Sequence, residues 1–188
     1  MRIVAGRLRG KKIHTPVDQS IRPTSERVRE ALFSILASRL DDGFGGKKVL
    51  DLFAGTGAMG LEALSRGARF CAFVDNGVQA RGIIRSNIEL LGLGGQSSLL
   101  KRDATDLGIA QKFQPFDLIF IDPPYGRGLA EKSLMSANRG NWIALGALIV
   151  IEESRKWDLD VLQGFELVDR RDYGQSSIWI LLKNNSKP

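Results

Sequence analysis

Residues 51–60 have the sequence Asp51-Leu-Phe-Ala-Gly55-Thr-Gly57-Ala-Met-Gly60, a glycine-rich loop that follows an apolar run and opens a helical one. Its glycines satisfy the dinucleotide pattern G-x-G-x-x-G, which alone is a weak indication of any one cofactor. Gly55 and Gly57 let the backbone turn tightly and approach a ligand, and the helix after them presents unpaired N–H groups with positive potential. The loop predicts a small-molecule site.

Outward from this loop, short apolar runs alternate with helical stretches, which is typical of an α/β protein. The predicted strands are Val49–Phe53, Phe70–Asp75, Ser98–Arg102, Asp117–Asp122 and Ala147–Glu152. Helices are expected after Gly57, Val78, Thr105 and Arg127. Alternating units of this kind predict a parallel, doubly wound sheet. Two further apolar runs, 165–170 and 177–183, are too close together for a crossover helix and should pair as an antiparallel hairpin.

The residues before the sheet form a basic extension. The chain of 188 residues carries 27 Lys and Arg against 21 Asp and Glu, a net charge of +6. Residues 1–29 hold eight basic and two acidic side chains, so the whole excess lies there. We therefore expect two parts: a basic arm and helix over residues 1–47, and a catalytic core over residues 48–188.

Local patterns predict two elements in this extension. Arg2–Gly6 and Lys11–Thr15 should pair as a short hairpin. Beyond Pro23, with Thr24 or Ser25 as the N-cap, apolar residues recur at the spacing of an amphipathic helix.

Other features of the chain exclude several classes of protein. The longest apolar runs, 118–121 and 147–151, fall far short of the roughly 18 residues that a membrane span requires. The N-terminus lacks the apolar segment of a secretory signal, so we expect a cytoplasmic protein. Cys71 is the single cysteine and His14 the single histidine, so neither a disulfide nor a metal site is expected.

Three aspartates favour one cofactor over another: Asp51 lies at the carboxyl end of the first predicted strand, and Asp75 and Asp103 end the second and third. Asp51 precedes Gly55 by four residues, where a carboxylate would repel a pyrophosphate and attract an ammonium group. S-adenosylmethionine carries an ammonium group and a sulfonium centre but no phosphate, and its carboxylate can use the helix N-terminus. Asp75 can accept both ribose hydroxyls, and Asp103 can reach an adenine amino group. We expect S-adenosylmethionine, bound by these aspartates with Gly55 and Gly57.

The fourth predicted strand leads into Asp122-Pro123-Pro124-Tyr125 at the carboxyl edge of the sheet, where open α/β sheets bind ligands. The Asp122 carboxylate and the Pro123 carbonyl offer two acceptors for the two hydrogens of a base's exocyclic amine, and Tyr125 offers a face for stacking. Accepting both hydrogens turns the nitrogen lone pair toward the methyl group, and the carboxylate stabilises the positive charge that develops. The position after an apolar strand favours an amino-group methyltransferase over a merely rigid turn, with these four residues catalytic.

The chain resembles class I S-adenosylmethionine-dependent methyltransferases and, among them, the bacterial 16S rRNA (guanine-N2)-methyltransferase family. The resemblance covers nearly the whole chain and rests on Arg2-Ile-Val-Ala-Gly-Arg-Leu-Arg-Gly10, Arg22-Pro-Thr-Ser-Glu-Arg-Val-Arg-Glu-Ala-Leu-Phe33, residues 51–60 and 122–125, and the closing hairpin. It implies a Rossmann-like sheet in the order 3-2-1-4-5-7-6 with the last strand antiparallel. It also implies, as substrate, the guanine conventionally numbered 966 in small-subunit rRNA. Family members often carry Phe in place of Tyr125, and either ring can stack.

If the partner is rRNA, the basic side chains of residues 1–47 have a role in binding it. These side chains should contact phosphates, which gives affinity that depends steeply on salt and carries little sequence information. The residues expected to bind RNA are Arg2, Arg7, Arg9, Lys11, Lys12, Arg22, Arg27 and Arg29. Site choice would then depend on RNA shape and on whether the guanine is already unstacked, because flipping a paired base costs a few kcal/mol.

Three other functions remain open at this point. A DNA adenine or cytosine amino-methyltransferase would share the Asp122 loop, but no insertion is large enough for a separate DNA-reading domain. A nicotinamide-dependent oxidoreductase would share the glycines, but Asp51 and the lack of hydride-handling residues disfavour it. A ribosome-assembly factor without chemistry would have no use for an intact Asp122–Tyr125 loop.

Overall fold

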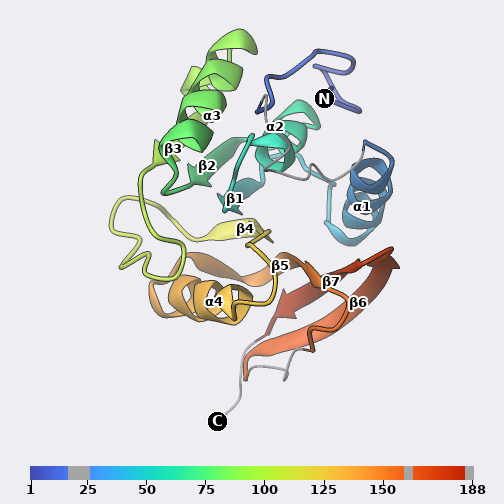
Figure 1. Ribbon diagram of the computed structural model, residues 1–188, viewed down its shortest axis with the longest axis vertical. Coiled ribbons are helices and arrows are strands. Elements are labelled where there is room, and N and C mark those ends of the chain that lie inside the picture. The colour runs from blue at the N-terminus through green and yellow to red at the C-terminus, as the bar shows by residue number, and fades with distance from the viewer. Residues whose placement is uncertain (17–25, 159–162, 185–188) are drawn as a thin grey trace. The chain divides into compact units, whose positions relative to one another are not determined.

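The computed structural model describes residues 1–16, 26–158 and 163–184. Its strands form a seven-stranded sheet in the order β3-β2-β1-β4-β5-β7-β6, which confirms the predicted order (Figure 1). The chain divides into two compact units, residues 1–101 and 102–188. No helix among the described residues is long and apolar enough to cross a membrane.

The first unit is built on three parallel strands whose side chains are largely buried. They are β1 (Lys48–Leu52), β2 (Phe70–Val74) and β3 (Ser97–Leu100). The helices are α1 (Glu26–Arg39), α2 (Ala58–Ser65) and α3 (Val78–Leu90), with a short 3-10 turn η1 (Gly94–Gln96). The predicted helix of the extension is confirmed as α1, while its expected N-cap, Thr24 or Ser25, lies outside the described residues.

Gly60 shows why α2 can lie so close to the sheet. A Cβ at this position would stand 2.4 Å from a ring carbon of Phe73 and 2.5 Å from the Cys71 sulfur. Both neighbours belong to β2 and are fully buried, so neither can move aside. The third glycine of the motif therefore serves helix–sheet packing, and its backbone N–H donates a hydrogen bond to Asp51 in β1.

The basic arm docks on α2 (Figure 1). Its predicted hairpin is confirmed in reduced form, as a single antiparallel bridge between Arg2 and Lys12. The N–H groups that a longer hairpin would pair are directed at α2 instead. Glu62 accepts hydrogen bonds from the N–H groups of Val4 (2.8 Å) and Ala5 (2.9 Å). The arm is thus a fixed part of the first unit.

The second unit contains a parallel strand pair and the closing hairpin. Its elements are β4 (Phe116–Ile121), α4 (Leu129–Arg139), β5 (Ile143–Ser154), β6 (Phe165–Tyr173) and β7 (Ser176–Lys183). β4 pairs with β5 in parallel, and β7 lies antiparallel to both β5 and β6. The hairpin is confirmed, with its strands extended to a turn at Gly174 and Gln175 (Figure 1).

The prediction of a helix after Thr105 is wrong. Residues 101–115, all of them described, form turns and coil. Their backbone groups find partners around the end of α4: Leu107 N–H donates to Ser136 Oγ (2.8 Å) and Ala110 N–H to the Gly140 carbonyl (2.9 Å). The indole of Trp142 donates to the Gly108 carbonyl (2.7 Å). These tertiary bonds replace the local bonds of a helix.

Candidate functional site

The carboxyl group of Asp51 lies beneath the glycine loop. Asp51 is in β1 with only 3% of its surface exposed, and its Oδ2 accepts a hydrogen bond of 2.9 Å from the Gly60 N–H. Burial raises the pKa of Asp51 to about 8, against the lowering effect of the Gly60 bond and with a further rise from Asp75. At pH 7 this group is therefore largely protonated, and a cation bound beside it would favour the ionised form.

We expect the Asp51 carboxyl to make the folded protein less stable as the pH rises. Its pKa is about 8 in the folded chain against an ordinary 3.8, so between these values unfolding releases a proton and the free energy of unfolding falls. Asp51→Asn keeps an acceptor for Gly60 but does not titrate. In urea unfolding, the free energy of unfolding of the variant should rise relative to that of the wild type by on the order of a few kcal/mol between pH 5 and pH 8. Equal pH dependences would show that Asp51 is already ionised at pH 5.

Asp75 fixes the glycine loop from the end of β2. Its Oδ2 accepts the Gly55 N–H (2.9 Å) and its Oδ1 accepts the Gly77 N–H (2.8 Å) at the start of α3. Gly55 and Gly57 have φ values of +55° and +77°, which L-residues rarely adopt, and Gly57 is the N-cap of α2. Each Asp75 oxygen retains a lone pair for a further donor, such as a ribose hydroxyl.

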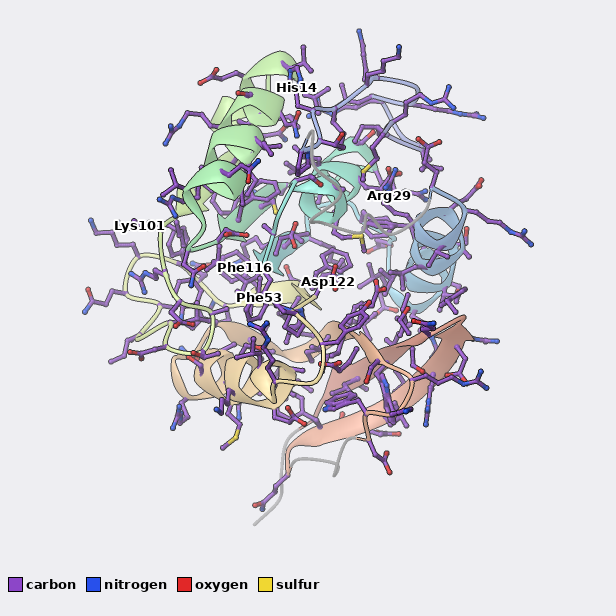
Figure 2. All side chains as sticks on the ribbon, viewed as in Figure 1. His14, Arg29, Phe53, Lys101, Phe116 and Asp122 are labelled. Atoms are coloured by element: carbon purple, nitrogen blue, oxygen red, sulfur yellow. The ribbon has the colours of Figure 1, made fainter. Side chains whose placement is uncertain are left out.

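Phe53 is an unexpected feature of the same loop. It has a φ of +57°, an outlier for a bulky residue that costs on the order of 1–3 kcal/mol. It immediately follows β1 and precedes Ala54, whose N–H donates to the Val74 carbonyl (3.2 Å). Figure 2 labels this side chain. Backbone strain of this kind concentrates at ligand sites, so Phe53 supports a binding role for the loop independently of the glycines.

Asn87 joins the glycine loop to the basic arm. This fully buried residue of α3 donates from Nδ2 to the carbonyls of Thr56 (3.0 Å) and His14 (3.1 Å). Its Oδ1 accepts the His14 N–H (2.7 Å), and Figure 2 labels His14 at the end of the arm. One amide side chain thus holds both segments through three hydrogen bonds. Its partners lie 31 and 73 residues away, so the local sequence contains no signal for this role.

Asp103 belongs to the second unit and is exposed. β3 ends at Leu100, so Asp103 follows the strand by three residues and does not end it as expected. Its Oδ1 accepts the hydroxyl (2.7 Å) and the N–H (2.8 Å) of Thr105. These two hydrogen bonds lower the pKa of Asp103, so its carboxylate is ionised at neutral pH.

The Asp122-Pro123-Pro124-Tyr125 loop follows β4 directly. Asp122, Pro124 and Tyr125 are exposed, whereas Pro123 is buried. The Tyr125 hydroxyl donates to Glu152 Oε1 (2.7 Å), and burial, followed by the Glu152 charge, raises the pKa of this phenol. Figure 2 labels Asp122 at the start of the loop. The loop therefore presents one carboxylate and one flat ring to an incoming group.

The basic residues of the arm differ in what they can contact. The guanidinium of Arg7 donates to Gln96 (2.5 Å), and Arg2 pairs with Glu26 (3.7 Å). The side chains of Arg2, Arg7, Arg9, Lys11, Lys12 and Arg27 are exposed. Arg22 lies outside the described residues.

Arg29 is a correction to the expected set of RNA-binding residues. Its side chain is fully buried, donates to the Arg2 carbonyl and lies 3.5 Å from Glu62. Figure 2 labels it on α1. Burial lowers the pKa of Arg29 and the Glu62 charge raises it. This arginine fastens the arm to α1 and α2 and is not available to a phosphate.

This chain is similar to one protein family and to several known proteins, three of which are named as methyltransferases. The model of a family described as Conserved hypothetical protein 95 matches residues 1–182. Ribosomal RNA small subunit methyltransferase D of Escherichia coli is 37% identical over 81% of this chain and 74% of its own. Putative rRNA methyltransferase YlbH of Bacillus subtilis is 32% identical over 97% of this chain and 99% of its own. The solved structure of putative methyltransferase yhhF from Escherichia coli aligns with a TM-score of 0.84 at 32% identity, covering 98% of both chains.

Proposed function

This chain belongs to the family described as Conserved hypothetical protein 95, and from that membership we propose that it methylates the exocyclic N2 amine of a guanine in small-subunit rRNA. The methyl donor is S-adenosylmethionine. The first unit holds this donor through its glycine loop, and the second unit holds the target amine at Asp122–Tyr125. The 16S guanine implied by the family resemblance is the proposed site, within a small-subunit particle.

The observation that carries the proposal is the Asp122 loop. An exposed carboxylate and an exposed ring follow the buried strand β4. An exocyclic amine has two hydrogens to donate, and the Asp122 carboxylate and Pro123 carbonyl are two acceptors in adjacent residues. The ring of Tyr125 supplies the stacking surface that holds a single unpaired base.

The residues of the first unit fit S-adenosylmethionine. Asp51 is a buried acid beside which an ammonium group favours ionisation. Asp75 has acceptor capacity for ribose hydroxyls, and the positive N-terminal end of α2 suits a carboxylate. When bound, S-adenosylmethionine supplies an electrophilic methyl group on sulfur.

Asp122 acts on the amine in two ways. The amine lone pair is delocalised into the base and is a poor nucleophile. By accepting one amine hydrogen while Pro123 accepts the other, Asp122 turns that lone pair out of the ring system. Its negative charge then stabilises the positive charge that develops on nitrogen as the carbon–nitrogen bond forms and the carbon–sulfur bond breaks. The donor leaves as a neutral thioether, and the methylated nitrogen loses one proton to solvent. Orientation of the amine by these acceptors lowers the entropic part of the barrier.

Residues 1–47 act as the RNA-binding extension in this proposal. The arm backbone is held by Glu62 and Asn87, so its exposed basic side chains project from a fixed backbone. Cations placed in this way suit a folded RNA whose phosphates have a defined spacing, and they neutralise those phosphates without reading bases.

Calorimetry tests the cofactor assignment. S-adenosylmethionine and its demethylated product should both bind, and NAD should give no measurable heat of binding. Asp51→Asn keeps the Gly60 hydrogen bond but loses the charge, so affinity for the methyl donor should fall by about tenfold or more. Tight binding of NAD with no response to S-adenosylmethionine would overturn the assignment in favour of an oxidoreductase.

A further inference from the structure

Two adjacent glutamates at the end of β5 contact the Asp122 loop from the same strand. Glu152 and Glu153 both belong to β5, which runs from Ile143 to Ser154. Successive side chains of a strand point to opposite faces of the sheet. Glu152 contacts the side chain of Tyr125, and Glu153 contacts the backbone of Gly126, the next residue. Two side chains on opposite faces of β5 therefore hold the end of the loop, one through the Tyr125 side chain and one through the Gly126 backbone.

Glu152 determines where the Tyr125 ring points. Its Oε1 accepts the Tyr125 hydroxyl at 2.7 Å and the Ser176 hydroxyl at 3.1 Å. Ser176 lies opposite Ser154 in the antiparallel pair of β5 and β7, so the carboxylate is itself fixed to the sheet. A hydrogen bond from a neutral phenol to a carboxylate is short and strong. Tyr125, which is 39% exposed, is thereby oriented while part of its surface stays accessible.

Glu153 holds the backbone of the same turn. Its side chain is fully buried, and Oε1 accepts the N–H groups of Gly126 (3.0 Å) and Ser154 (2.7 Å). Burying a carboxylate is costly unless such donors compensate it. An apolar residue would fill this position without that cost but would leave the Gly126 N–H without its acceptor. The buried charge is thus used to fix the turn that follows Tyr125.

We infer that Glu152 and Glu153 are positioning residues for methyl transfer, which hold the Asp122–Tyr125 loop in the geometry that receives the target amine. This inference rests on the proposed function of that loop. Neither carboxylate needs to touch the base. Glu152 acts through the phenol of Tyr125, and Glu153 acts through the backbone of Gly126. Loss of either carboxylate therefore displaces the stacking ring and the neighbouring acceptors.

Single-turnover methylation of rRNA tests the role of Glu152. A Phe ring can still stack, but in this chain the ring is oriented through its phenol, so Glu152→Ala and Tyr125→Phe should each slow the methyl-transfer step by about 10- to 100-fold at saturating RNA. A displacement near 1 Å has effects of that size. The dissociation constants for RNA and cofactor should change by less than about threefold. Glu152→Gln should restore most of the rate, since its amide oxygen still accepts the phenol. The double variant Tyr125→Phe/Glu152→Ala should be no slower than the worse single variant, because both remove one interaction.

A matched control removes a carboxylate elsewhere in the same unit. Glu166 on β6 is exposed and accepts a hydrogen bond from Asn184, so Glu166→Ala should leave the transfer rate unchanged. Transfer at the wild-type rate in both Glu152→Ala and Tyr125→Phe would overturn the inference for Glu152. So would rates that fall only in parallel with thermal stability and recover on cooling.

A second measurement needs no activity and separates this inference from the proposed function. Amide hydrogen exchange at Gly126 should be at least tenfold faster in Glu153→Ala than in the wild type, and unchanged in Glu166→Ala. Equal exchange in Glu153→Ala and wild type would overturn the role of Glu153 even if the enzyme methylates rRNA. Faster exchange in a protein that methylates no RNA would leave the positioning intact and refute the function.

Discussion

Asp122→Ala should reduce the rate of methyl transfer to rRNA by roughly 100- to 1,000-fold, the usual effect of removing an electrostatic stabiliser from an active site. The carboxylate acts on the amine that receives the methyl group, and its loop lies in the unit that begins at Arg102. The dissociation constant for S-adenosylmethionine should therefore stay within a few-fold of the wild type. Single-turnover assays with bound cofactor measure the first quantity, and calorimetry measures the second.

Two further variants separate the contributions of Asp122. Asp122→Asn retains an oxygen acceptor and loses the charge, so its rate should lie between those of the wild type and the alanine variant. Asp41→Ala removes an exposed carboxylate from the segment after α1 and should leave the rate unchanged. Near-wild-type transfer by Asp122→Ala would show that the loop is only a structural turn.

The second large effect concerns the basic arm. Replacing Arg7, Arg9, Lys11 and Lys12 with Ala should weaken rRNA binding and flatten its dependence on the logarithm of salt concentration. If each side chain contacts one phosphate, the slope should fall by roughly 0.7 to 0.9 per residue. Cofactor affinity should not change, because the arm backbone is held by Glu62 and Asn87, which the substitutions leave in place.

A charge-matched control distinguishes phosphate contacts from a general change in net charge. Four other exposed lysines serve as this control: Lys101, Lys112, Lys132 and Lys156. Their replacement with Ala removes the same number of positive charges as the arm variant. This control should leave the salt slope close to that of the wild type. Equal slopes for the wild type and the arm variant would show that the arm charges only solubilise the protein. The search for the RNA surface would then move to Arg27 and Arg127, which are exposed, and to Arg22.

The buried strands could be predicted because their signal is local. An apolar run bounded by turn residues has few alternatives to a central strand. The observed ends of β1, β2, β4 and β5 all lie within four residues of the predicted ends. The segment after Thr105 also contains apolar residues, Leu107, Ala110 and Phe113, at helical spacing. The N–H groups of Leu107 and Ala110 instead donate hydrogen bonds to Ser136 and Gly140, which lie far away in the sequence. No local pattern reveals such partners.

The prediction that Arg29 binds RNA was wrong, although the sequence contains a signal for its burial that charge counting overlooks. Arg29 precedes Leu32, Phe33 and Leu36 by three, four and seven residues, which places it on the apolar face of α1. An arginine on that face is buried with a partner, here Glu62. Glu152, Glu153 and Asn87 are different, because each acts on a residue at least 27 positions away and becomes visible only when the chain is folded.

The measurement that bears most directly on the proposed function is the location of the transferred methyl group. Small-subunit RNA and small-subunit particles from cells lacking this protein are incubated with the purified protein and isotopically labelled S-adenosylmethionine. The RNA is then digested and its nucleosides are identified. The label should appear as N2-methylguanosine at one position of the small-subunit RNA, and Asp122→Ala should not produce it. Label on adenine or at another atom of guanine, or no incorporation into either substrate, would contradict the proposed function.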